Sequence, residues 1–231
     1  TGTLQIKKLL EGKGVDKFAV DNELKFKVDC TFNGKELNAT NFPQFFNLPD
    51  LSKEYSFKVA ANQTEWESEV IKNIPVLSVC KVTEIEKGNA SSVIDNVEVT
   101  IAFDEDKQVG SDEVAVIKNT YEASNLYLTK KLEGEYATNQ SKTKFEVNIK
   151  CVLMNENNKE EEQFSGIISI LGGETKQVVD KDGKPVLLSI GTKCYGEETF
   201  WGEASKHEVD YNSLDNAIEV VSGTEKITIT A

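Results

Sequence analysis

Hydrophobic and polar residues alternate along most of the chain, in short runs such as Leu24–Cys30 (LKFKVDC) and Lys144–Cys151 (KFEVNIKC). A period of two places successive side chains on opposite faces of a strand, so that one face can be buried. Turn-forming clusters separate the runs, among them NGKE, EKGNASS and DKDGKP. Many short strands with turns between them predict an all-β protein built of antiparallel β-sandwiches, of the immunoglobulin-like or prealbumin-like type.

One segment also fits a helical period. In TEWESEVIKNI the apolar residues Trp66, Val70 and Ile74 are spaced by four, as on one face of a helix. The segment is short and runs into a turn at Ile74-Pro75. We therefore favour a strand here over a helix.

The chain repeats itself. The segment Leu4–Gly12 (LQIKKLLEG) returns as Leu126–Gly134 (LYLTKKLEG), an offset of 122 residues (126 − 4). In each copy a cysteine closes a later alternating run, and a glutamate lies four residues beyond a second cysteine. Matching features in one order predict two tandem domains, residues 1–120 and 121–231, joined near 120–124.

The four cysteines are distributed two to each copy. Four cysteines allow three pairings, and spacing alone does not select among them. The repeat favours Cys30 with Cys80 and Cys151 with Cys194, because pairing across the domains would require the two sandwiches to fold into each other. Such disulfides imply an extracytoplasmic location, whereas four reduced core thiols would fit a cytosolic protein.

Charge excludes several classes of partner. The net charge of -13 repels phosphate backbones and anionic lipid, so we expect no nucleic-acid and no membrane-surface binding. No apolar run is long enough to span a bilayer. Because the chain stops within the alternating run ITITA, we expect it to be a piece of a longer protein. We also expect the chain to be monomeric.

The residues of a typical active site are missing from the sequence. The single histidine, His207, has no cysteine or second histidine near it, and no catalytic triad, zinc spacing or phosphate-binding loop is present. Acidic loops such as DEDKQVGSDE suggest calcium, but solvated turns explain them more simply. We predict no enzyme acting on an external substrate, no cofactor and no metal.

Three segments carry a family resemblance. The opening strands end in K-x-L-x-G, the second copy has GTKCYGEET (Gly191–Thr199), and the first copy closes with VAVIKNTY (Val114–Tyr121). With these segments the chain resembles tandem domains of Gram-positive cell-wall-anchored adhesins and pilin-like stalks, similar to the collagen-adhesin B (CnaB-type) sandwich. The resemblance covers both halves and implies a location on the bacterial cell surface.

The resemblance also implies an internal isopeptide bond between a first-strand lysine and a last-strand asparagine, under control of a buried glutamate. In the first copy the matching residues are Lys8, Asn119 and Glu84. In the second copy they are Lys130 and Glu198, with the partner beyond the chain end. Alternation independently places both lysines on the apolar face of their strands, where an ammonium needs a partner. The alternative is that the lysines extend to solvent and that Asn119 only caps a domain boundary.

Two functions remain open. The first is a structural stalk or spacer of a surface protein, whose partners are the neighbouring domains of that protein. The second is an adhesive module that recognises a host glycoprotein, glycan or matrix protein. Its contact loop would be Asn38–Pro49 (NATNFPQFFNLP), with Phe42, Phe45 and Phe46 exposed, because the second copy has no such aromatic loop.

Overall fold

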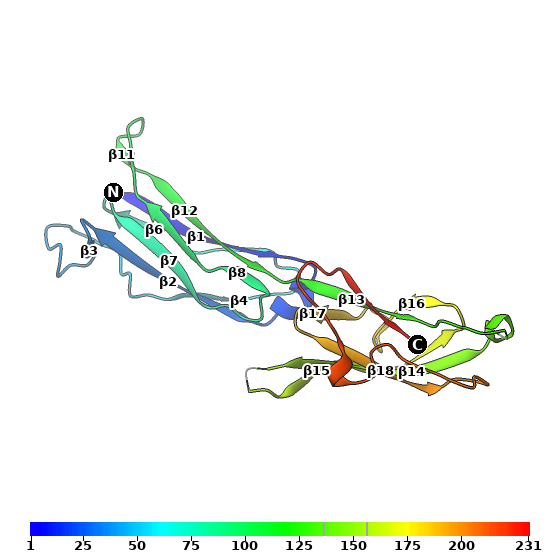
Figure 1. Cartoon of the computed structure of the whole chain (residues 1–231). Coiled ribbons are helices and arrows are strands. Elements are labelled where there is room, and N and C mark those ends of the chain that lie inside the picture. The colour runs from blue at the N-terminus through cyan, green and yellow to red at the C-terminus, as the bar shows by residue number, and fades with distance from the viewer. Residues whose placement is uncertain (136, 156) are drawn as a thin grey trace. The chain divides into compact units, whose positions relative to one another are not determined.

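The computed structural model describes residues 1–135, 137–155 and 157–231 (Figure 1). The all-β prediction is confirmed: strands dominate, and the described helical elements are three short turns. The chain divides into two compact units, unit 1 (Thr1–Tyr121) and unit 2 (Glu122–Ala231). Each has its own apolar core.

The first sheet of unit 1 is built around its first and last strands. Its order is β5-β1-β12-β8, and β6 also pairs with β1. Strands β1 and β12 run parallel, with Lys8 opposite Ile117 and Leu10 opposite Asn119. The strands are β1 (Gly2–Glu11), β5 (Glu65–Glu67), β6 (Ile71–Ile74), β8 (Ser92–Ile94) and β12 (Asp112–Thr120).

The second sheet of unit 1 has the order β3-β2-β7-β9, and β4 also pairs with β2. Its strands are antiparallel. They are β2 (Glu23–Phe32), β3 (Lys35–Glu36), β4 (Tyr55–Lys58), β7 (Val79–Glu86) and β9 (Asn96–Thr100). The remaining elements are a single π-helical turn, η1 (Val15–Ala19), and the hairpin of β10 (Phe103–Asp104) and β11 (Val109–Gly110).

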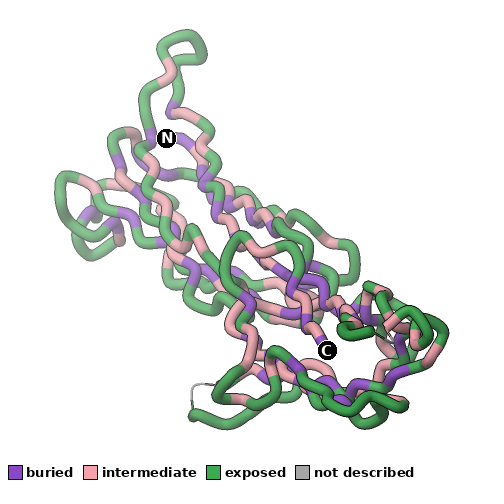
Figure 2. The backbone as a smooth tube through the Cα atoms, turned by 45° about the vertical axis from the view of Figure 1, so that its right-hand side comes forward, coloured by how far each residue is buried: buried purple, intermediate pink, exposed green. Residues whose placement is uncertain are grey.

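The core of unit 1 follows from the alternation. In β1 every second residue is buried, and in β2 Leu24, Phe26 and Val28 are buried in the same way. Figure 2 shows this as short buried and less buried stretches that succeed one another along the strands. The strand prediction for TEWESEVIKNI is also confirmed, because the segment forms β5 and β6.

Unit 2 also has two sheets. One has the order β16-β13-β17, with β20 pairing parallel to β13, and the other is the antiparallel sheet β15-β14-β18-β19. The strands are β13 (Ala123–Thr129), β14 (Lys144–Met154), β15 (Glu160–Leu171), β16 (Thr175–Gln177), β17 (Leu187–Ser189), β18 (Lys193–Phe200), β19 (Ile218–Glu219) and β20 (Lys226–Thr230). Two 3-10 turns complete it, η2 (Ala137–Gln140) and η3 (Leu214–Asn216).

One detail departs from a purely antiparallel sandwich. In both units the first strand pairs with the last strand in parallel. Parallel neighbours cannot be joined by a tight hairpin, and here the whole of each unit lies between them in sequence. Periodicity alone does not report strand direction.

Candidate crosslinking site

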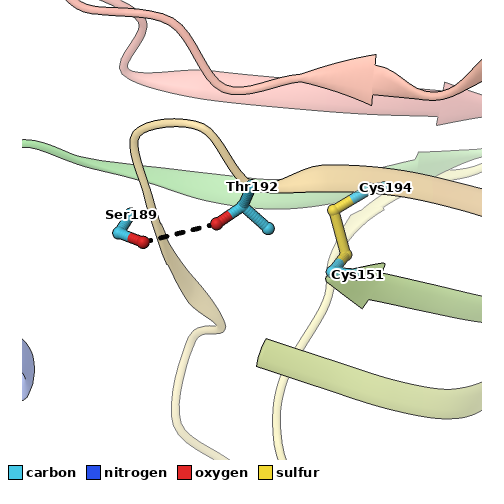
Figure 3. Close-up of a disulfide and its surroundings, with 4 residues drawn as sticks. All are labelled: Cys151, Ser189, Thr192 and Cys194. Carbon is cyan, nitrogen blue, oxygen red and sulfur yellow. Dashed lines mark hydrogen bonds between the residues drawn. A yellow bond between two sulfur atoms is a disulfide. The ribbon is translucent and has the colours of Figure 1, made fainter. Parts of the chain in front are cut away.

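Each unit contains one disulfide between adjacent strands. Cys30 of β2 is bonded to Cys80 of β7, and Cys151 of β14 is bonded to Cys194 of β18 (Figure 3). In both cases the two cysteines lie directly opposite each other in the antiparallel ladder. The described residues contain no free cysteine.

A second cluster of unit 1 joins Lys8, Glu84 and Asn119. The Lys8 side chain is fully buried, and its Nζ donates to Glu84 Oε2 at 2.8 Å and to Asn119 Oδ1 at 2.5 Å. Asn119 Nδ2 donates to Glu84 Oε1 at 3.1 Å. Each of the three side chains therefore contacts the other two, and all three are removed from solvent.

The two sheets together position this triad. Lys8 and Asn119 come from the parallel neighbours β1 and β12, two register positions apart, while Glu84 comes from β7 of the facing sheet. The ring of Phe26 on β2 lies 5.7 Å from Lys8 Nζ. The amine is thus enclosed by an aromatic face, a carboxylate and a carboxamide.

Burial changes the protonation of the pair. Desolvation lowers the pKa of Lys8 to about 8, although the hydrogen bond and charge of Glu84 oppose the shift. Desolvation likewise raises the pKa of Glu84, against the hydrogen bond from Lys8. Both shifts favour a neutral amine beside a neutral acid over a buried ion pair.

A neutral amine held against a carboxamide can form an amide bond. Lys8 Nζ would attack Asn119 Cγ, and Nδ2 would leave as ammonia after receiving a proton through Glu84. Glu84 contacts both the attacking and the leaving nitrogen, as this proton transfer requires. The backbone carbonyl of Lys87 accepts from the same Nδ2 at 3.2 Å and fixes the orientation of the carboxamide.

Unit 2 holds two members of an equivalent triad. Lys130 Nζ lies 2.7 Å from Glu198 Oε1 and 4.6 Å from the ring of Phe145, and both charged residues are buried. The contact between them is not aligned as a hydrogen bond, and neither oxygen of Glu198 has a hydrogen-bond partner among the described residues. The position taken by Asn119 in unit 1 has no counterpart among the described residues of unit 2.

The register shows which position that would be. Thr129 lies opposite Thr230, and Ala231 N donates to Thr129 O while Lys131 N donates to Ala231 O. Ala231 therefore corresponds to Ile117, and Asn119 corresponds to the second position of a strand continuing β20. A cavity of about 990 Å³ beside Ala231 includes Lys130 in its lining.

Two residues of the site were not predicted. Sequence reasoning named neither the Lys87 carbonyl nor Tyr121, a buried residue whose hydroxyl has no hydrogen-bond partner in the described part of the chain. Tyr121 follows Asn119 by two positions, so continued alternation would have placed it on the same face. The Lys87 carbonyl left no signal, since a backbone group in a turn carries none.

The predicted contact loop is largely exposed, but it does not expose all three of its phenylalanines. Phe42 is 6% exposed and packs edge-on against Phe32, as does the half-buried Phe45, whereas Phe46 is 85% exposed. The loop therefore presents one aromatic side chain where three were predicted. The lone His207 is exposed and stacks on Trp201.

Neither a metal-binding cluster nor a membrane-spanning helix occurs among the described residues. No group of three or more histidine, cysteine, aspartate or glutamate side chains there is arranged to hold a metal ion. No helix in the same residues has the length and apolar character needed to cross a membrane.

Comparison with known proteins identifies a family and a fold. A family model described as "Domain of unknown function (DUF5979)" matches residues 4–123. No curated protein matches the sequence. Among solved structures, the major pilin protein (T-13) from Streptococcus pyogenes is similar with a TM-score of 0.50 and 10% identity, over 99% of this chain and 96% of the pilin.

Two other solved structures are less similar. The major pilin T3.2 of Streptococcus pyogenes has a TM-score of 0.46 and 13% identity, over 99% of this chain and 96% of that one. The Bacillus anthracis TIE protein has a TM-score of 0.35 and 16% identity, over 100% of this chain and 33% of that one. At these identities the likeness to T-13 shows a shared β-sandwich fold, and a fold does not assign a function.

Proposed function

The chain belongs to the family described as Domain of unknown function (DUF5979), and we propose that it is a load-bearing stalk segment of a bacterial cell-surface protein. Unit 1 would be locked by a Lys8–Asn119 isopeptide bond in addition to its disulfide. The observation that carries this proposal is the buried contact of Lys8 with both Asn119 and Glu84.

The place of the bond in the fold suits a stalk. A pull on the ends of unit 1 enters at Thr1, in front of β1, and leaves at Tyr121, behind β12. Since β1 and β12 are parallel neighbours, this pull shears one strand along the other. A bond from Lys8 to Asn119 would carry that force covalently and bypass the 110 residues between them (118 − 9 + 1).

The two disulfides support an extracytoplasmic location, where thiols remain oxidised. They serve a different purpose from the proposed bond, because Cys30 and Cys80 join strands of the second sheet. Closing a loop of this length stabilises a domain by up to about 4 kcal/mol in the chain-entropy model. Together the two bonds would tie both sheets of unit 1.

Intact mass tests the bond directly. Once the two disulfides are accounted for, the folded chain should weigh about 17 Da less than its sequence, the mass of one ammonia, and Asn119→Ala should restore the full mass. A wild-type mass without this deficit would overturn the proposed bond.

Stretching single molecules tests the stalk function. Wild-type unit 1 should give no unfolding step, whereas unit 1 of Asn119→Ala should lengthen by up to ~250 Å, since about 70 residues lie outside its disulfide loop. Unit 2 has its disulfide, and its described residues supply no third triad member, so its step serves as an internal control in both molecules. An unfolding step from wild-type unit 1 at the force that unfolds the variant would refute a load-bearing role.

We propose the same chemistry for unit 2 when a strand continuing β20 supplies the carboxamide. The register requires an asparagine at the second position after Ala231. A chain extended by Lys-Asn-Thr-Tyr, the four residues that follow Ile117 in unit 1, should lose a second ammonia. The control is an extension by Lys-Ala-Thr-Tyr, which should lose only the first.

An adhesive module is the second candidate, and the exposure of Phe46 favours it. A single exposed aromatic ring can anchor a protein contact when polar residues surround it. If unit 1 is adhesive, Phe46→Ser should weaken its adhesion to immobilised matrix glycoproteins without changing its melting temperature. Equal adhesion of the two proteins would leave the stalk as the function of this segment.

A further inference from the structure

Tyr121 is held directly behind the triad by its backbone. Its N–H donates to Glu11 O at 2.8 Å, and its carbonyl accepts from Gly14 N at 2.9 Å. Gly12 has a φ of +101°, and a Cβ there would lie 2.4 Å from the Tyr121 carbonyl oxygen. The glycine of the K-x-L-x-G motif in unit 1 is therefore needed for the close approach of this tyrosine.

The hydroxyl of Tyr121 is buried beside the reacting groups. The residue is 1% exposed, and its hydroxyl lies next to the carboxamides of Asn119 and Asn22 without being aligned with either as a hydrogen bond. Burial raises the pKa of this phenol, and the adjacent carboxamide of Asn119 opposes the shift. A buried hydroxyl without a partner is costly and rare, so it calls for an explanation.

The hydrogen bonds of the uncrosslinked Asn119 explain why the Tyr121 hydroxyl has no partner. Its amide nitrogen already donates to Glu84 and to the Lys87 carbonyl, and its oxygen already accepts from Lys8. The nitrogen of a planar carboxamide accepts no hydrogen bond, because its lone pair is delocalised. Both N–H groups of the uncrosslinked carboxamide are therefore engaged, and its neutral oxygen, which already accepts from Lys8, is a weaker acceptor for the Tyr121 proton than an oxyanion would be.

Attack by Lys8 changes both atoms. When the bond from Nζ to Cγ forms, the electron pair of the carbonyl moves to Oδ1, which becomes an oxyanion. Cγ becomes tetrahedral, so the lone pair of Nδ2 is no longer delocalised and becomes basic. Either atom is then a strong acceptor, so the Tyr121 hydroxyl would gain a partner in the intermediate that it lacks in the starting state.

We propose that Tyr121 is a catalytic residue of the crosslinking reaction, whose hydroxyl donates a hydrogen bond to the tetrahedral adduct of Lys8 and Asn119. An interaction made only after attack lowers the barrier without stabilising the reactants. Glu84 carries the proton from Nζ to Nδ2, ammonia leaves, and the Tyr121 proton stays on its oxygen. The proposal rests on the proposed isopeptide bond and adds a donor that assists its formation.

The test follows bond formation in time. The full chain is recovered from inclusion bodies in denaturant with its cysteines reduced, before the triad has assembled, and is refolded by dilution into an oxidising buffer. Mass spectrometry records the loss of ammonia, and fluorescence records the folding of unit 1 in parallel, with Trp201→Phe in every protein compared so that Trp66 is the only tryptophan. Tyr121→Phe keeps the ring and removes only the hydroxyl, while Tyr55→Phe does the same at another buried tyrosine of unit 1.

Tyr121→Phe should fold at the wild-type rate and lose ammonia roughly 100-fold more slowly, as when one donor is removed from an oxyanion site. Tyr55→Phe should match the wild type in both. A more acidic fluorinated tyrosine at position 121 should change the rate with phenol acidity, which a purely structural role would not do.

The outcomes separate the two proposals. Equal rates of ammonia loss in Tyr121→Phe and the wild type would overturn the role of Tyr121 and leave the bond in place. A slower reaction that merely follows slower folding would also overturn it. No ammonia loss in the wild type would overturn both the bond and the role of Tyr121.

Discussion

Replacing Asn119 with alanine removes the electrophile of the proposed bond and leaves the contact of Lys8 with Glu84 in place. The bond would close a loop between residues 111 positions apart, and the Cys30–Cys80 disulfide, with a separation of 50, already shortens that loop. The effective loop is therefore about 60 residues. Closing it lowers the entropy of the unfolded chain and so raises the free energy of unfolding by about 4 kcal/mol.

That free energy corresponds to a large change in melting temperature. For a domain of this size each kcal/mol shifts the melting temperature by about 4 °C, so Asn119→Ala should lower that of unit 1 by about 15 °C. The lost hydrogen bonds of Asn119 are a smaller contribution, about 1 kcal/mol each. Unit 2 should keep its melting temperature, because it forms a separate compact unit with its own core.

Differential scanning calorimetry measures both transitions in one experiment. The expected thermogram of the variant has one transition displaced downward and one unchanged. The loss of the three side-chain hydrogen bonds of Asn119 would by itself lower the melting temperature by about 12 °C. A shift of about 12 °C or less in a sample whose wild-type mass shows the complete bond would therefore refute a covalent contribution of about 4 kcal/mol. The mass of the same sample shows whether the wild-type bond was complete.

Three further predictions concern the same site and its surroundings. Because only the neutral amine of Lys8 attacks and burial lowers its pKa to about 8, the rate of ammonia loss after refolding should rise about tenfold per pH unit below 8 and level off above it; a rate independent of pH would contradict this. Replacing Cys30 and Cys80 with alanine should lower the denaturation free energy of unit 1 by up to about 4 kcal/mol and leave unit 2 unchanged, as denaturant titration would show. Gly12→Ala should destabilise unit 1 more than Gly134→Ala destabilises unit 2, because both glycines have a φ near +100° but a Cβ at Gly134 would meet no atom of the described residues within 4 Å. Equal losses of unfolding free energy in the two variants would mean that the backbone conformation alone causes them.

The fold class could be predicted because alternation reports which side chains are buried. The fully buried Lys8 illustrates this, since its register with Leu4 and Ile6 places it on the core face despite its charge. The alternation of apolar and polar residues does not predict strand direction or the order in which strands pair. The parallel pairing of β1 with β12 depends on contacts between the two ends of the unit, which no local pattern describes.

The exposure of side chains in the contact loop was predicted only in part. Asn38–Pro49 contains turn-forming residues and three phenylalanines, and the sequence pattern was interpreted as an exposed apolar loop. Phe42 instead packs on the core, and Phe45 is half-buried beside it, because both rings contact Phe32 of β2, whereas Phe46 is exposed as expected. Turn propensity predicts where a chain bends, but it does not predict on which side of the bend a side chain packs.

The difference between the units is most informative at their equivalent glycines. Gly12 and Gly134 adopt nearly the same φ, +101° and +98°, although only Gly12 has a neighbour, Tyr121, that excludes a side chain. The turn conformation in unit 2 is therefore not produced by contact with a following strand. The buried contact of Lys130 with Glu198 likewise forms although no carboxamide contacts either side chain among the described residues. On this argument the lysine, the glutamate and the glycine turn are arranged by the sandwich itself, without a carboxamide at the position that Asn119 occupies in unit 1.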